Sequence, residues 1–155
     1  ECELAVVLGK DARDVPAGQT KDYVFGYTIL NDVSARDVQT AHKQWYFGKS
    51  LDGFTPIGPC IVTADAFADY PPRLGIRSFV NGEKRQDSNT ALQIFDIDHV
   101  IAELSQGMTL KAGTIIATGT PAGVGMGMDP PQFLKPGDTV RCEIDGIGSL
   151  TNTVR

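Results

Sequence analysis

The chain opens with Glu1-Cys2-Glu3-Leu4-Ala5-Val6-Val7-Leu8-Gly9, an apolar run that carries two carboxylates at its start. A short continuous apolar run bounded by glycine is typical of a buried strand. Side chains two residues apart on a strand point to the same face, so Glu1 and Glu3 are predicted to be neighbours. The sequence therefore predicts a strand over residues 1–9 with a pair of acidic groups at one end.

Other strands are predicted along the rest of the chain. Their patterns lie at 25–30, 77–80, 83–85, 114–118, 140–144 and 147–150. Asn81-Gly82 and Asp145-Gly146 separate two pairs of these segments. Both dipeptides tolerate the positive φ angles of tight two-residue turns, so each pair is predicted to form a hairpin.

Helices are predicted to be few. They cover a turn near 21–24, a helix over 35–44 capped by the Ser34 hydroxyl, and an amphipathic helix over 98–105. The last has an apolar stripe of Val100, Ile101 and Leu104, with Asp96 or Asp98 at its start and Gly107 after its end. Because these helices do not alternate with the strands, the predicted fold class is α+β, predominantly β, and not a doubly wound α/β sheet.

The composition is that of an ordinary globular domain. The 155 residues include 14 Lys and Arg against 19 Asp and Glu, for a net charge of −5, and 41% are hydrophobic. An acidic chain lacks the cationic face that non-specific nucleic-acid binding needs, and no apolar run approaches the ~20 residues of a membrane span. We expect one soluble, cytoplasmic domain over residues 1–155, with no nucleic-acid or membrane partner. Because a domain seldom begins in mid-strand, we also expect it to be the C-terminal part of a longer protein.

The three cysteines, Cys2, Cys60 and Cys142, have no C-x-x-C spacing and lie in apolar stretches. We expect them to be reduced and buried as small hydrophobic residues. A zinc site is excluded because His42 and His99 are not spaced to join them.

Two acidic motifs admit both a functional and a structural interpretation. Glu1 and Glu3 are either the ligands of a cation, which would offset their repulsion, or a solvated strand end. Asp32 follows the strand over 25–30, a position common for functional groups, but aspartate also suits such turns for local hydrogen bonding. Residue spacing alone leaves both pairs of alternatives open.

Two further motifs suggest a ligand site. The aromatic residues of 45–47, followed by Lys49, suit a planar anionic substrate, or else form a loop that covers the core while Lys49 reaches water. The glycine-rich stretch 117–127 lacks the third glycine of a dinucleotide fingerprint, because position 128 is Met128, and no helix follows it. We expect it instead to bring backbone N–H groups and the hydroxyls of Thr118 and Thr120 close to a carboxylate. The chain has no G-x-S-x-G motif for a serine nucleophile.

Taken in order, these motifs resemble the C-terminal catalytic domain of the fumarylacetoacetate hydrolase superfamily. The resemblance spans nearly the whole chain and depends on the ordered set rather than on any single motif. The matching residues are Glu1-x-Glu3, Asn31-Asp32-x-Ser34-Ala35-Arg36-Asp37-x-Gln39, Gly48-Lys49-Ser50, Gln86-Asp87-Ser88-Asn89-Thr90 and Thr118-Gly119-Thr120-Pro121-Ala122-Gly123-Val124-Gly125.

The resemblance implies a fold, a metal and an assembly. The fold would be the mixed β-sandwich or β-roll of that superfamily with a few short helices, usually in a homodimer. Glu1, Glu3 and Asp32 would hold Mg²⁺, Mn²⁺ or Ca²⁺, and carboxylate oxygens are the ligands these ions prefer. The metal would leave open positions for the carboxylate and keto oxygens of a small 2-oxo acid substrate.

The resemblance also implies roles for residues around the metal. Lys49 would be catalytic and bind substrate, because its ammonium can stabilise the negative charge of an enolate. Gln39, Gly119 and Thr120 would bind the substrate as well. Arg36 and Asp37 are assigned to a supporting internal ion pair.

Several reactions are compatible with this site. Family members cleave acylpyruvates as hydrolases, decarboxylate oxo acids as lyases, or isomerise 2-hydroxy-dienedioates in aromatic catabolism. Residues 80–90 are most similar to bacterial members named 2-hydroxyhepta-2,4-diene-1,7-dioate isomerase or 5-carboxymethyl-2-oxo-hex-3-ene-1,7-dioate decarboxylase. Family hydrolases activate water with a His–Glu pair upstream of the Glu-x-Glu motif, and neither His42 nor His99 matches that position. The alternative is a catalytically inactive family member that binds a metal and an oxo acid.

Overall fold

The computed structural model describes residues 1–41 and 43–155, and these form two antiparallel sheets of four strands each. The first sheet has the order β3-β2-β1-β6 and the second β5-β4-β7-β8. The strands are β1 (Cys2–Leu8), β2 (Val24–Asn31), β3 (Ile57–Thr63), β4 (Gly75–Val80), β5 (Glu83–Asn89), β6 (Ile115–Ala117), β7 (Thr139–Ile144) and β8 (Gly148–Thr153). The predominantly β, α+β fold class is confirmed.

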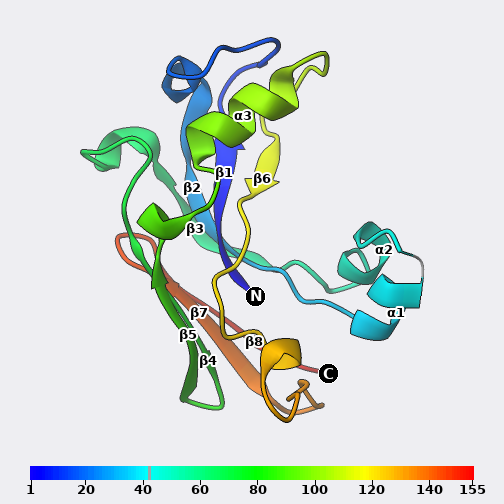
Figure 1. Ribbon diagram of the computed structural model, residues 1–155. Coiled ribbons are helices and arrows are strands. Elements are labelled where there is room, and N and C mark those ends of the chain that lie inside the picture. The colour runs from blue at the N-terminus through cyan, green and yellow to red at the C-terminus, as the bar shows by residue number, and fades with distance from the viewer. Residues whose placement is uncertain (42) are drawn as a thin grey trace.

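The helices are short and lie around the sheets (Figure 1). They are α1 (Arg36–Ala41), α2 (Tyr46–Lys49) and α3 (Ile97–Ser105), with 3₁₀ turns at Thr20–Tyr23, Ala64–Ala66, Thr90–Leu92 and Gly125–Gly127. The α1–α2 segment projects from the body of the molecule, whereas α3 packs beside the first sheet (Figure 1). No helix among residues 1–41 and 43–155 is long and apolar enough to cross a bilayer.

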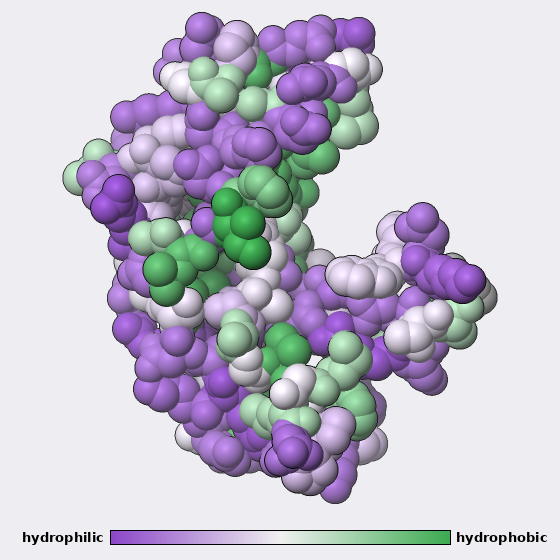
Figure 2. All heavy atoms as spheres, in the orientation of Figure 1, coloured by the Kyte–Doolittle hydropathy of each residue, from purple (hydrophilic) through white to green (hydrophobic). Residues whose placement is uncertain are grey.

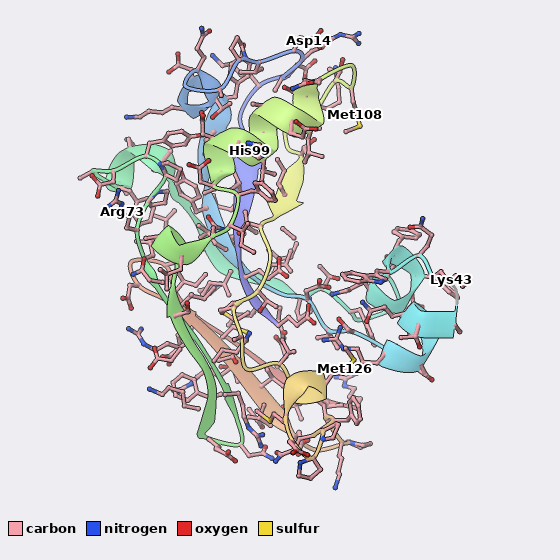
Figure 3. The ribbon with its side chains drawn as sticks, in the orientation of Figure 1. Asp14, Lys43, Arg73, His99, Met108 and Met126 are labelled. Carbon is pink, nitrogen blue, oxygen red and sulfur yellow. The ribbon has the colours of Figure 1, made fainter. Side chains whose placement is uncertain are left out.

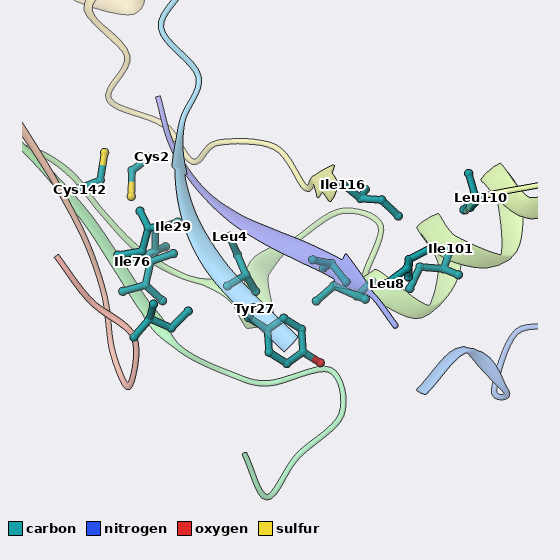
Figure 4. Packing of buried hydrophobic residues seen from close by; sticks show 14 of the residues in the cluster. Cys2, Leu4, Leu8, Tyr27, Ile29, Ile76, Ile101, Leu110, Ile116 and Cys142 are labelled. Atoms are coloured by element: carbon teal, nitrogen blue, oxygen red, sulfur yellow. The ribbon is translucent and has the colours of Figure 1, made fainter. Parts of the chain in front are cut away.

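β1 is buried along its whole length, as its sequence predicts. It is a central strand between β2 and β6, and its alternate side chains Cys2, Leu4, Val6 and Leu8 enter the core. Figure 4 shows this core, in which residues of β1 and β2 meet Ile76 and Cys142 of the second sheet. Glu1 and Glu3 therefore project from the opposite face of the strand.

Both predicted hairpins are present, between β4 and β5 and between β7 and β8. Asn81 and Gly82 have φ angles of 52° and 85° between β4 and β5, as a two-residue turn requires. The second turn is one residue longer than predicted, because Ile147 belongs to the loop and its N–H bonds to the Ile144 carbonyl. β3 was not predicted, since Pro59 interrupts the pattern, but an edge strand tolerates a residue without an N–H.

Four local predictions are wrong. Ser34 does not cap a helix: its hydroxyl donates to the Asp32 carbonyl at 3.0 Å, and α1 ends at Ala41 rather than at 44, with His42 outside the described residues. Asp96, one of the two residues predicted to begin α3, is its N-cap, but Leu104 faces solvent. Cys60 is exposed because it lies on edge strand β3, whereas Cys2 and Cys142 are buried.

Candidate functional site

Three carboxylates meet where β1 begins and β2 ends. The antiparallel register pairs Cys2 with Asn31, and the Asp32 N–H donates to the Glu1 carbonyl at 2.9 Å. This pairing places Asp32 beside Glu1, while the strand period places Glu3 on the same face as Glu1. One oxygen from each of the three side chains lies within 4.8 Å of the other two. The structure thus brings together all three residues predicted as metal ligands.

Two cationic side chains contact this acidic cluster, defined as Glu1, Glu3 and Asp32. Lys49 Nζ donates to Glu1 Oε2 at 2.8 Å and to Asp32 Oδ2 at 2.5 Å. Arg36 Nη2 donates to the other oxygen of Glu1. The three carboxylates are therefore only partly neutralised, and the site keeps a net charge of −1 if all five groups are ionised.

The α1–α2 segment brings both cations to the cluster. The Ala35 N–H donates to the Gly48 carbonyl at 2.9 Å, so the start of α1 and the end of α2 are in contact. A Cβ on Gly48 would come within 2.8 Å of the Ala35 carbonyl oxygen and of the Gln39 nitrogen. Glycine at this position allows the close approach that places Lys49 next to the carboxylates.

Two sequence interpretations of this segment are wrong. Among the described residues Arg36 pairs with Glu1 and not with Asp37. The aromatic side chains neither cover the core nor line the cavity at the cluster, because Trp45 is 66% and Tyr46 77% exposed. Lys49 is held by carboxylates rather than reaching water.

The protein shifts the pKa values of Glu1 and Glu3 in opposite directions. Burial would raise the pKa of Glu1, but hydrogen bonds from Lys49 and Arg36 outweigh it and lower that pKa. Glu3 is 3% exposed, and no cationic side chain among residues 1–41 and 43–155 forms an ion pair with it. Burial raises the pKa of Glu3 to about 7, with the charges of Asp32 and Glu1 adding to the effect against a hydrogen bond from the Gly119 N–H.

The other predicted site residues have protein partners. The Gly119 N–H donates to Glu3 Oε2 at 2.8 Å, which agrees with a backbone donor beside a carboxylate. The Thr120 hydroxyl donates to the Cys2 carbonyl at 3.0 Å. Gln39 is buried and its side-chain oxygen accepts from Arg36 Nη1 at 2.9 Å. Arg36 and Gln39 are three residues apart on α1, a spacing that could have predicted their contact.

Cavities flank the cluster. A cavity of about 1040 Å³ is lined by Glu1, Asp32 and Arg36. A second, of about 450 Å³, is lined by Gly119, Thr120 and Leu4. Figure 2 shows the surface hollowed beside the projecting α1–α2 segment. The cluster is therefore accessible to a small molecule from the larger cavity.

Sequence comparison assigns the family. The model of the fumarylacetoacetate (FAA) hydrolase C-terminal family matches residues 1–155. The chain belongs to the FAA hydrolase family. Its relatives include oxaloacetate tautomerase YisK of Bacillus subtilis (strain 168), 50% identical over 154 residues, which are 99% of this chain and 51% of that protein. The chain thus spans about half the length of the curated relatives it matches.

Solved structures of FAA hydrolase family proteins have the same fold. A fumarylacetoacetate hydrolase from Exiguobacterium antarcticum superposes with a TM-score of 0.96 at 51% identity, over 100% of this chain and 55% of that one. The 2-hydroxyhepta-2,4-diene-1,7-dioate isomerase from Mycobacterium marinum has a TM-score of 0.88 at 47% identity, over 99% and 56% of the two chains.

Proposed function

We propose that this chain is the catalytic part of a divalent-metal-dependent enzyme that acts on small 2-oxo carboxylates, with Glu1, Glu3 and Asp32 as the metal ligands. The observation that carries the proposal is the acidic cluster, whose ligand oxygens lie within 4.8 Å of one another. Carboxylates are hard oxygen donors and suit Mg²⁺, Mn²⁺ or Ca²⁺. Such an ion, when bound, would polarise the substrate's keto oxygen and stabilise negative charge on it.

The cationic residues support an anionic substrate. Lys49 and Arg36 now contact the carboxylates that a divalent ion would neutralise. With the ion present, the site would carry a net charge of +1, which favours a substrate carboxylate and the negative charge that develops in the reaction. Gln39 holds Arg36 in this position, and Gly119 and Thr120 line the second cavity, with the Gly119 N–H bonded to Glu3.

Two relatives are named for isomerisations, whereas the Exiguobacterium antarcticum structure is named a hydrolase. Oxaloacetate tautomerase YisK and the Mycobacterium marinum isomerase are both named for isomerisations of a carboxylate compound. We therefore propose keto–enol isomerisation of a 2-oxo dicarboxylate, in which a proton leaves the carbon next to the keto group and another joins the keto oxygen. Decarboxylation and C–C hydrolysis are the competing reactions at a site of this kind.

One observation favours a second candidate, a non-catalytic binder of metal and oxo acid. His99 lies on α3 (Figure 3). Its ring stacks on that of Phe95 with centroids 4.7 Å apart. Among residues 1–41 and 43–155, no histidine contacts the acidic cluster. An imidazole is the commonest general base in enzymes, so the described residues leave the proton acceptor unassigned.

Turnover with a matched pair of variants tests the proposal. The full-length protein is incubated with oxaloacetate or acetylpyruvate, with and without Mn²⁺, and enol absorbance and released products are followed. We expect Mn²⁺-dependent isomerisation that Asp32→Asn reduces at least ~100-fold. Asp37→Asn is the control, because Asp37 lines the same cavity outside the cluster. Mn²⁺ binding without turnover would support the non-catalytic binder, and absence of both would overturn the proposal.

A further inference from the structure

The segment after β6 is attached to β1 by one further backbone bond, from the Thr118 N–H to the Leu4 carbonyl at 3.3 Å, and then through side chains. The β1–β6 pairing ends at Ala117, and Gly119 has a φ angle of 94°. Beyond that point the Thr118 hydroxyl donates to the Leu4 carbonyl at 2.8 Å and the Thr120 hydroxyl to the Cys2 carbonyl at 3.0 Å. This segment also supplies the Gly119 N–H that donates to Glu3, so its position determines the surroundings of a carboxylate in the cluster.

Gln86 connects this segment to β1 from the other sheet. It lies on β5 and is 2% exposed. Its side-chain oxygen accepts from the Cys2 N–H at 3.0 Å. Its Nε2 donates to Thr120 Oγ1 at 2.7 Å and to the Pro121 carbonyl at 2.8 Å. Both amide hydrogens and the amide oxygen are thus used between the two backbone segments.

We infer that Gln86 is a positioning residue that sets the spacing between the strand carrying Glu1 and Glu3 and the segment carrying Gly119 and Thr120. The inference rests on the proposed function, since it concerns the same site. Buried amide groups are costly to leave without partners, so the three bonds of Gln86 restrict both segments at once. Cys2 lies between the two glutamates, and its N–H is the point at which Gln86 fixes that strand.

The geometry explains why an amide is required rather than another buried group. Cys2 presents a donor, whereas Pro121 presents only an acceptor. A glutamine offers one acceptor and two donors in a single plane. Leucine satisfies none of these partners. An ionised glutamate accepts from the Cys2 N–H but offers no donor to the Pro121 carbonyl, and it bonds to Thr120 only if that hydroxyl gives up the Cys2 carbonyl. The two substitutions therefore remove different parts of the connection.

Gln86→Leu, Gln86→Glu and Ser105→Ala test the inference in the full-length protein. Ser105 is also buried and joins two segments, through Val15 N–H at 3.1 Å and the Ala102 carbonyl at 3.1 Å, but it lies on α3 outside the site. The readouts are Mn²⁺ affinity, the separate values of kcat and KM, the melting temperature, and the ¹H–¹⁵N shift of the Gly119 amide. We expect Mn²⁺ affinity to fall roughly tenfold or more in Gln86→Leu, less in Gln86→Glu, and not in Ser105→Ala.

The outcomes separate a positioning role from a general loss of stability. Equal loss of melting temperature in Gln86→Leu and Ser105→Ala, with Mn²⁺ affinity and the Gly119 shift unchanged in both, would overturn the inference. If Gln86→Leu does not fold, the isosteric Gln86→Glu, which keeps the bond to Cys2 but loses the one to Pro121, is compared with Ser105→Ala instead. If the unmodified protein neither binds Mn²⁺ nor turns over substrate, the proposed function fails. The Gly119 shift in Gln86→Glu then still decides whether Gln86 positions this segment.

Discussion

In the metal-free protein, the surroundings of Glu3 disfavour the ionised form of its carboxylate. Burial raises its pKa to about 7 from an ordinary value of 4.5, and the neighbouring charges of Asp32 and Glu1 act in the same direction. Between these two pH values the folded protein binds more protons than the unfolded chain. Stability of the metal-free protein therefore falls as pH rises from about 4.5 to about 7, and stays lower above that range.

Glu3→Gln is predicted to stabilise the metal-free protein while removing metal binding. Glutamine keeps an oxygen for the Gly119 N–H but carries no charge. We expect a gain of about 1–3 kcal/mol at about pH 8 and little difference at about pH 4.5. Calorimetric unfolding with a chelator present measures the gain, and Mn²⁺ titration measures the loss. Parallel pH profiles for the two proteins would contradict this account of Glu3.

Lys49→Met is predicted to separate metal binding from turnover. Burial would lower the pKa of Lys49, but its hydrogen bonds to Asp32 and Glu1 raise it, so the ammonium is held between the two carboxylates. Without it the metal-free protein should lose about 1–3 kcal/mol, because two partly buried carboxylates lose their partner.

The same variant should bind Mn²⁺ at least as tightly as the unmodified protein, since a competing cation is gone, yet turn over substrate ~100-fold more slowly. Isothermal titration and initial rates provide the two measurements. Lys49→Arg is the control, because it keeps the charge but changes the donor geometry. A large loss of Mn²⁺ affinity in Lys49→Met would mean that Lys49 organises the ligands rather than acting on the substrate.

The glycine-rich loop after β6 depends on close backbone contacts rather than on nucleotide binding. A Cβ on Gly123, whose φ is 106°, would lie 2.1 Å from the Arg85 carbonyl oxygen. A Cβ on Gly127 would meet nothing closer than 3.7 Å. The two glycines therefore differ in whether a side chain can be accommodated.

Gly123→Ala is predicted to destabilise the protein by at least about 2 kcal/mol, because both its φ and its contact with β5 are incompatible with a side chain. Gly127→Ala should change stability by less than about 1 kcal/mol. Urea unfolding of the two variants measures the difference. Similar losses in both would show that this loop adjusts to a side chain.

At the scale of helices, strands and turns, features that depend on neighbouring residues could be predicted, whereas features that depend on distant segments could not. The Asn81-Gly82 turn could be predicted because both φ requirements are local. The absence of a Ser34 cap could not be predicted. The Ser34 hydroxyl bonds to the Asp32 carbonyl, while the Ala35 N–H bonds to the carbonyl of Gly48, 13 residues further along the chain. Contacts between distant segments carry no local pattern that a single sequence reveals.

Part of the acidic cluster could be predicted, because its first two residues lie close together in the sequence. The proximity of Glu1 and Glu3 follows from the strand period, whereas the choice of Glu1, Glu3 and Asp32 as metal ligands came from the resemblance to the family. The contact of Arg36 with Glu1 was not predicted. Asp37 is the nearest acidic residue in the sequence, but the fold places the Arg36 side chain beside Glu1. Gln86 was part of a matching motif, but its partners Cys2 and Thr120 lie 84 and 34 residues away.

The two sheets share one core, and the acidic cluster lies at the end of its central strand. Cys2, between the two glutamates, packs in that core with Cys142 of the second sheet (Figure 4). A ligand that binds the cluster therefore binds a feature of the fully folded molecule that the unfolded chain lacks. Metal binding should consequently stabilise the whole protein, by an amount that mass action determines.

Mn²⁺ at about 100 times its dissociation constant is predicted to stabilise the protein by about 2.7 kcal/mol. At this chain length each kcal/mol raises the melting temperature by roughly 2–4 °C, so the expected increase is roughly 5–11 °C, reversed by a chelator. At a fixed Mn²⁺ concentration the increase should be larger at about pH 8 than at about pH 6, because the ion must displace the proton of Glu3, whose pKa is about 7. Asp32→Asn should respond to Mn²⁺ at neither pH, whereas Asp37→Asn should respond like the unmodified protein. An increase that is the same at both pH values would mean either that Glu3 is not a ligand or that its pKa in the metal-free protein is not near 7, and Mn²⁺ titration of Glu3→Gln separates the two.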